Sequence, residues 1–157
     1  MRAEMWRAGL IYGGGDLAAT LITGHVQPMR AVGIFLIGAL LYAPEIRGYF
    51  GWLERSRPNP QGFGPRLQRA ALAWLWFNPL WIARHALFIR WLSGRPHPFD
   101  AGLLTIGFTS FALNMPVALT ANYLIQNRLP LRWRLTGSAS FSAVMAVYYA
   151  LSEVWFG

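Results

Sequence analysis

Long apolar runs, separated by short polar links, dominate the chain. They fall at about residues 8–24, 29–53, 70–93, 101–126 and 135–156. Each run is close to the roughly 20 residues that a helix needs to cross a bilayer. Because the runs are continuous and do not alternate with a period of two, helices are favoured over the strands of a membrane barrel. The pattern therefore predicts an all-α fold, a polytopic transmembrane helix bundle with four to five membrane helices.

The polar links are short and hold most of the arginines. The longest, residues 54–69, has four arginines and three prolines, so we expect a loop or an interfacial segment there. Residues 95–100 and 126–134 are expected to form two further turns. Because no internal repeat or low-complexity tract divides the chain, we expect a single integral membrane domain over residues 1–157.

The composition supports a membrane protein. Apolar residues make up 55% of the chain and charged residues only 13%, which is poor in charge for a soluble domain of this size. All fourteen basic residues are arginine, and six acids leave a formal net charge of +8. On a soluble protein such a charge would suggest nucleic acid, but these arginines lie between apolar segments, where anionic lipid headgroups suit them. We therefore expect membrane lipids, and no nucleic acid, as partners.

The distribution of arginine predicts an orientation. With five spans, the N-terminus and the links 54–69 and 126–134 share one side of the membrane. That side holds Arg2, Arg7, Arg55, Arg57, Arg66, Arg69, Arg128, Arg132 and Arg134. The other side holds Arg30, Arg90 and Arg95. The positive-inside rule then places the N-terminus in the cytoplasm, and the C-terminus outside unless the last segment lies on the surface. Lysine-free, arginine-rich usage suggests a GC-rich genome, so we expect a multi-pass protein of a bacterial inner membrane.

Little in the sequence points to catalysis or to a cofactor. There are no cysteines, and the three histidines fall in different segments without the spacing of metal ligands. No set of serine, histidine and acid is suggested, and only one acid lies deep in a predicted span. We expect a protein that is not an enzyme, with no metal and no cofactor.

Asp16, in the stretch "YGGGDLAATLITG", is the sharpest candidate for a functional group. An ionisable residue inside a span usually faces the bundle interior or a water-filled path. The three glycines before it allow a neighbouring helix to come close. Asp16 is thus expected either to line a polar path or to brace the bundle, paired with Arg47 or with Arg84.

A second candidate is Arg84 with His85, which follow Pro79 by one to two helical turns. Because a proline can kink a helix, this pair can act as a gate or as a contact for an anion. Alternatively, Arg84 snorkels toward the interface and His85 is an incidental neighbour. Three asparagines are expected to make interhelical hydrogen bonds: Asn78, Asn114 and Asn122.

The stretch "GALLYAPEIRGYFGWLERSRP", residues 38–58, carries a family pattern. Its spacing is P-x4-Y-F-x2-L-E-R-x2-P, formed by Pro44, Tyr49, Phe50, Leu53, Glu54, Arg55 and Pro58. It resembles, without a gap, the pattern G-P-x4-W-Y-x2-L-D/E-R-x2-P of the twenty-two-kilodalton peroxisomal membrane protein family, which includes mitochondrial inner-membrane relatives.

Four further stretches are similar to this family's motifs and follow its order along the chain. They are Gly15 with Asp16, Phe77 and Pro79 with Gly94 fifteen residues later, Pro116 with Asn122 and Tyr123, and Pro130 with Arg134. Together the matching stretches cover most of the chain. The chain departs from the family at Thr20, Ala73, Met115 and Leu119, and in three extra residues between Asn122 and Pro130.

The resemblance implies a compact bundle of membrane helices with channel-like or solute-permeation activity, for a solute that it does not specify. No catalytic residues are implied. The pore or bundle centre is then expected to be lined or braced by Asp16, Arg47, Arg84, His85 and Asn122. The alternative is a non-catalytic accessory subunit that packs against a larger membrane complex, respiratory or photosynthetic. A homo-oligomer is also compatible with the sequence.

Overall fold

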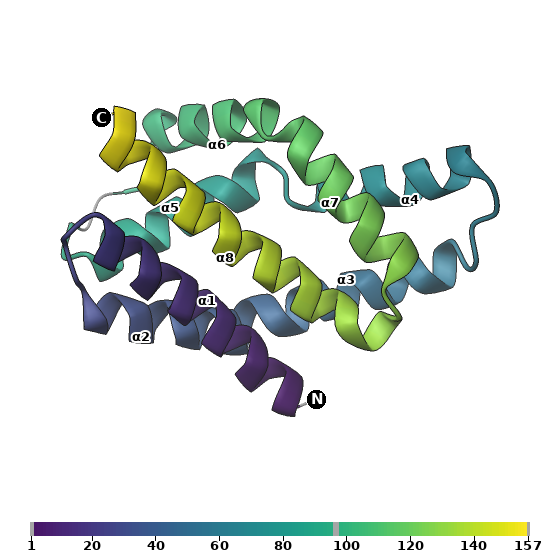
Figure 1. Cartoon of the computed structure of the whole chain (residues 1–157), viewed down its shortest axis with the longest axis horizontal. Coiled ribbons are helices and arrows are strands. Elements are labelled where there is room, and N and C mark those ends of the chain that lie inside the picture. Colours follow the sequence, from purple (N-terminus) through teal and green to yellow (C-terminus); the bar gives the residue numbers. More distant parts are fainter. Residues whose placement is uncertain (1, 96–97, 157) are drawn as a thin grey trace. The chain divides into compact units, whose positions relative to one another are not determined.

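The computed structural model describes residues 2–95 and 98–156, with side chains described as far as residue 148. These residues form helices and connecting turns, and within these ranges there is no strand. The helices are α1 (Arg2–Ile22), α2 (Pro28–Ile37), η1 (Gly38–Tyr42), α3 (Ala43–Ser56), α4 (Phe63–Trp76), α5 (Pro79–Leu92), α6 (Ala101–Leu113), α7 (Met115–Arg128) and α8 (Leu131–Phe156) (Figure 1). The prediction of an all-α fold is confirmed.

The chain forms two compact units. Unit 1 contains Met1–Gly48 and Leu135–Gly157, and unit 2 contains Tyr49–Arg134. Buried apolar side chains of unit 1 include Tyr12, Ile34 and Tyr42, and those of unit 2 include Phe50, Leu53 and Leu103. Each unit is described by itself below, and the single membrane domain expected from the sequence stays a prediction.

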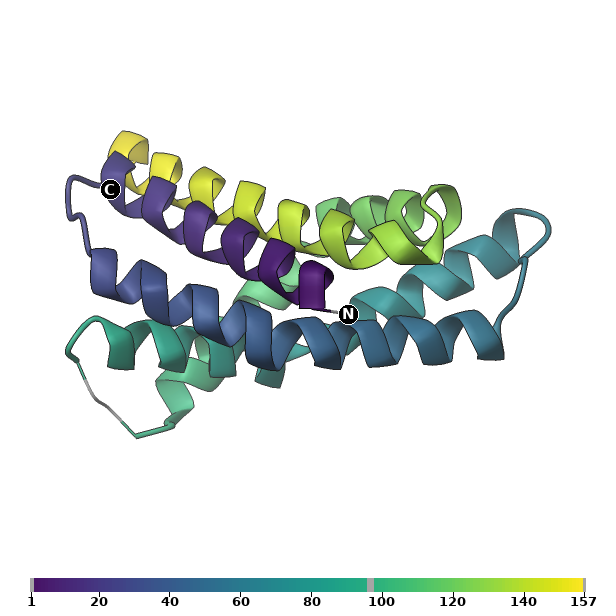
Figure 2. The same ribbon diagram turned by 90° about the horizontal axis from the view of Figure 1, so that it is seen from below.

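Glycines set the packing of α1 in unit 1. Helix α1 runs beside α2 and η1 (Figures 1 and 2). A Cβ atom added at Gly13 would lie 2.9 Å from the carbonyl oxygen of Ala31, and one added at Gly15 would lie 2.7 Å from Cβ of Ala143 in α8. Gly14 instead faces open space. The prediction that these glycines allow close helix contact is therefore confirmed at Gly13 and Gly15.

A π-helical turn, η1, precedes Pro44. There the N–H of Ala43 donates to the carbonyl oxygen of Gly38, five residues back, so the helix is wider than an α-helix. The wider turn lies just before Pro44. Pro44 has no N–H to donate to the helix, and its ring crowds the preceding turn. Together α2, η1 and α3 continue as one helix of 29 residues, Pro28–Ser56 (Figure 2).

Two of the five predicted apolar segments are interrupted. Residues 70–93 divide between α4 and α5, and residues 101–126 divide between α6 and α7, which are bent by 67°. The prolines explain both breaks, because Pro79 and Pro116 lack a backbone N–H and disturb the turn before them. Asn78 caps α5, since its side chain accepts a hydrogen bond from the N–H of Trp81 at 3.1 Å. The expected bond from Asn78 to another helix stays a prediction, since this cap uses only the side-chain oxygen.

One helix of the described residues, Pro28–Ser56, is long and apolar enough to cross a membrane. The bent pair α6 and α7 meets the same requirement when its two helices are taken together. These candidates coincide with two of the predicted spans, 29–53 and 101–126. The other three spans, and hence a bundle of four to five, stay predictions.

In unit 2, α4 packs on α7, and α5 packs on α6. The rings of Trp74 and Phe111 stack with centroids 4.3 Å apart. Gly107 of α6 lies so close to α5 that an added Cβ would collide with the carbonyl oxygen of Pro79. Because α3 continues to Ser56 and α4 begins at Phe63, the non-helical part of the predicted 54–69 link shrinks to residues 57–62.

Candidate functional site

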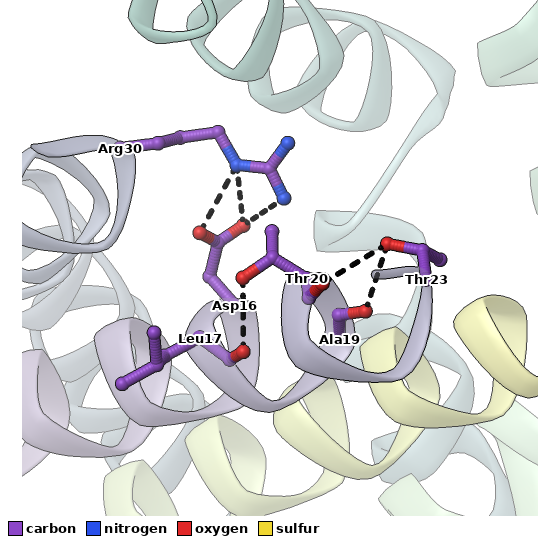
Figure 3. Close-up of polar contacts among 6 residues, drawn as sticks. All are labelled: Asp16, Leu17, Ala19, Thr20, Thr23 and Arg30. Atoms are coloured by element: carbon purple, nitrogen blue, oxygen red, sulfur yellow. Dashed lines mark hydrogen bonds and ion pairs between the residues drawn. The ribbon is translucent and has the colours of Figure 1, made fainter. Parts of the chain in front are cut away.

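A largely buried ion pair, with the Arg30 side chain 14% exposed, joins α1 and α2 in unit 1 (Figure 3). Asp16 is only 7% exposed, and the Nε of Arg30 donates to both of its carboxylate oxygens at 3.1 Å. The Nη2 of Arg30 lies 2.9 Å from Oδ1. This forked arrangement is the strongest geometry for an arginine and a carboxylate. The predicted burial of Asp16 is confirmed, but its partner is Arg30, so the expected pairing with Arg47 or Arg84 is wrong.

The short turn between α1 and α2 explains this partner. Helix α1 ends at Ile22 and α2 begins at Pro28, with Gly24 in the left-handed region at φ 73°. Asp16 and Arg30 lie seven residues on either side of Thr23, so a helical hairpin brings them opposite each other. The signal in the sequence was the closely spaced glycine and proline, which mark a hairpin. The distribution of arginine alone places Arg30 only on the side of the membrane opposite the N-terminus.

Arg47, the second candidate, lies at the surface of unit 1. Its side chain is 50% exposed and forms an ion pair with Glu4 of α1. The pair stabilises little, because exposed ion pairs are largely balanced by hydration. Arg47 and Asp16 thus have different partners and do not form one cluster.

The remaining candidates belong to unit 2. The guanidinium carbon of Arg84 lies 5.6 Å from the ring centre of Trp81, and the ring of His85 stacks on the same indole at 6.0 Å. The structure therefore brings Arg84 and His85 together on one tryptophan of α5. Asn122 of α7 is buried and donates to the carbonyl oxygen of Ala118 at 2.9 Å, within its own helix. For this amide donor, the expected interhelical bond is replaced by an intrahelical one.

A second charged cluster, which the sequence reasoning did not assemble, lies in unit 2. Oε2 of Glu54 receives ion pairs from both Nη2 of Arg69 and Nη1 of Arg134. Arg134 also donates from Nε to the carbonyl oxygen of Leu129 at 3.0 Å. The two arginines are 2% and 6% exposed, respectively. Glu54 and Arg134, which are 80 residues apart in the chain, are thus in direct contact.

Burial affects the titration of both arginines. It lowers the pKa of Arg69 to about 10, and the nearby charge of Arg134 acts in the same direction. Burial also lowers the pKa of Arg134. At neutral pH both guanidinium groups stay protonated, and Glu54 balances one of the two charges.

The cluster forms one wall of a polar cavity of about 170 Å³. The cavity is lined by Glu54, Arg66, Arg69, Gln126, Asn127 and Arg134, together with the loop residues 59–61. Asn127 braces it, because its Nδ2 donates to the carbonyl oxygens of Arg66 in α4 and Tyr123 in α7. Sequence reasoning missed Arg69, Gln126 and Asn127 as site residues, since their burial depends on contacts between segments about 60 residues apart.

Comparisons of the chain with protein-family models, with known proteins and with solved structures gave no match. The class that the fold and the sites define is a helical protein with one or two candidate membrane-spanning helices.

Proposed function

We propose that this chain is a multi-spanning membrane protein of the twenty-two-kilodalton peroxisomal membrane protein family, through which a small polar solute permeates beside Asp16 and Arg30. The observation that carries the proposal is this buried ion pair between two apolar helices. Replacing a buried ion pair by apolar residues is often neutral or stabilising, so stability alone gives no reason for the pair. Charged groups inside membrane helices typically mark solute or ion paths.

The membrane arrangement proposed here has five spans and a cytoplasmic N-terminus in a bacterial inner membrane. Two of the spans correspond to Pro28–Ser56 and to the bent pair α6 and α7. The contact of Glu54 with Arg134, beside its contact with Arg69, supports a common side for the two arginine-rich links. The ion pair between Glu54 and Arg134 also supports the family resemblance, because it joins residues from two of the matching motifs.

Flux through the purified chain in liposomes tests the proposal. We expect conductance and uptake of small polar solutes above the level of empty liposomes. Asp16→Asn should reduce both to near that level, because it removes the negative half of the pair and leaves the Arg30 charge unbalanced in the path. The matched control is Arg57→Gln, which removes one charge from an exposed residue in the 57–62 loop and should leave flux unchanged.

Two results would contradict the permeation proposal. One is a folded wild-type chain that gives no flux above empty liposomes. The other is a flux that Asp16→Asn leaves at the wild-type level.

A row of exposed apolar residues on α1 favours a second candidate, the accessory subunit. Trp6, Leu10, Leu17 and Leu21 recur at helical spacing and are 61%, 66%, 36% and 57% exposed. Such a row suits either lipid or a partner helix. Purification in mild detergent separates the two functions. A stoichiometric larger complex that shows no flux favours the accessory subunit. A chain that conducts when purified alone favours permeation, because no larger complex is then required.

A further inference from the structure

The polar cavity of unit 2 has the charge of an anion site. We call it the arginine pocket, defined by Glu54, Arg66, Arg69, Gln126, Asn127 and Arg134. Three arginines against one glutamate leave two positive charges at its wall. The volume of about 170 Å³ accommodates several water molecules, and hence a group of a few heavy atoms.

Gln126 is the residue that most clearly points to a ligand. It is 0% exposed, and among the described residues neither its Nε2 nor its Oε1 has a hydrogen-bond partner. A buried amide without partners is unfavourable, so such groups are rare in folded proteins. Since Gln126 lines the pocket, a ligand in the pocket can supply the missing hydrogen bonds.

Two neighbours of Gln126 have similar unmatched atoms. In the part of the chain that the structure describes, Nε of Arg69 and Oδ1 of Asn127 are buried and make no hydrogen bond. The unmatched set therefore contains two donors, Nε2 of Gln126 and Nε of Arg69, and two acceptors. Oxyanion oxygens would match the donors, and a hydroxyl group would match the acceptors.

Glu54 shows that the pocket arginines converge on an oxyanion. One carboxylate oxygen meets both Arg69 and Arg134. Arginine binds phosphate and carboxylate in the same forked geometry. The Glu54 side chain is 31% exposed, so it can turn toward solvent when another anion takes its place.

We propose that the arginine pocket binds a phosphate group that bears or adjoins a hydroxyl. A phosphate monoester carries about −1.5 to −2 charges at neutral pH, so it offsets more of the charge of the three pocket arginines than a single carboxylate does. Its source is either a soluble phosphate ester or the headgroup of a phospholipid. The proposal does not depend on permeation, because binding requires unit 2 alone and no transport.

Thermal unfolding and calorimetry of the full chain in a neutral detergent test this proposal. The soluble probes are inorganic phosphate and glycerol 3-phosphate, and the lipid probe is phosphatidic acid in phosphatidylcholine nanodiscs. Saturable one-to-one binding of glycerol 3-phosphate identifies a soluble source. Stabilisation by phosphatidic acid alone, over nanodiscs of pure phosphatidylcholine, identifies a lipid source.

Three variants link the binding to the pocket. Gln126→Leu should fold with an unchanged or higher Tm without ligand, since a buried unmatched amide is removed, and should weaken binding about tenfold or more. Arg69→Gln should weaken binding about ten- to a hundredfold. Glu54→Gln should tighten binding about tenfold, because the competing carboxylate is gone.

The matched control is Arg128→Gln, which removes the same charge from an exposed residue two positions after Gln126. It should change the Kd by less than twofold. The proposal is overturned if a folded wild-type chain binds neither class of probe. It is also overturned if Gln126→Leu binds like the wild type, or if Arg128→Gln weakens binding as much as Arg69→Gln.

Discussion

Asp16 is a buried acid whose charge is balanced by Arg30 through a forked contact. Breaking a buried pair on one side is more costly than removing both partners, because the remaining charge stays buried. We therefore expect Asp16→Asn to lower the free energy of unfolding by about 3 kcal/mol. The double variant Asp16→Asn with Arg30→Gln should lose less than the sum of the single variants, with a coupling of about 1–3 kcal/mol.

Reversible unfolding in mixed micelles measures the four free energies of this cycle. The control is Arg47→Gln, which breaks the exposed pair with Glu4 and should cost at most about 1 kcal/mol. A coupling near zero between Asp16 and Arg30 would show that the two side chains do not stabilise each other.

Individual residues also differ in how well their place in the structure could be predicted from the sequence. The burial of Asp16 follows from one acid in an apolar run, but its partner follows only once the turn at Gly24 is recognised. Gln126 and Arg69 look like ordinary polar residues near the ends of apolar segments. Their burial arises from contacts between α3, α4, α7 and the start of α8, which no local pattern encodes.

At the scale of elements, small residues decide which faces of α1 can pack. An added Cβ at Gly15 would lie 2.7 Å from Cβ and 2.9 Å from Cα of Ala143. We expect Gly15→Ala to lower the free energy of unfolding by about 1–2 kcal/mol, because α1 and α8 must move apart. Gly14→Ala meets nothing within 4 Å and should raise it by about 0.5–1 kcal/mol, since alanine favours the helix.

The two glycine variants are chemically identical and adjacent, so their difference isolates packing from helix propensity. Unfolding curves measured under one condition supply the comparison. If both variants shift stability in the same direction, the close contact between α1 and α8 is not present in the protein.

The apolar runs predicted where helices lie better than where they stop. All five runs are mostly helical, but two of them contain a break near a proline, Pro79 or Pro116. Hydrophobicity varies little across these breaks and therefore does not predict them. The prolines do predict them, because proline lacks an N–H and its ring crowds the preceding turn. Next to Pro44 the helix adapts differently, by widening into the π-helical turn η1.

At the scale of the whole molecule, we propose a chain that crosses a membrane several times. Two segments meet the length and hydropathy that a span requires. In unit 2 the links around residues 54–69 and 126–134 meet through Glu54 and Arg134. Several membrane spans with both arginine-rich links on one side would agree with the proposed phosphate site at these links. They would also agree with the ion pair between the apolar helices α1 and α2.

Labelling of single cysteines tests the proposed membrane crossings, and the chain suits this experiment because its sequence contains no cysteine. Each variant is placed in vesicles of known orientation and treated with a maleimide that cannot cross the membrane. Ser56→Cys and Leu131→Cys should react only from the cytoplasmic side. His25→Cys and Phe99→Cys should react only from the opposite side. Labelling of His25→Cys and Ser56→Cys from the same side would contradict the account, because the helix Pro28–Ser56 would then not cross the membrane.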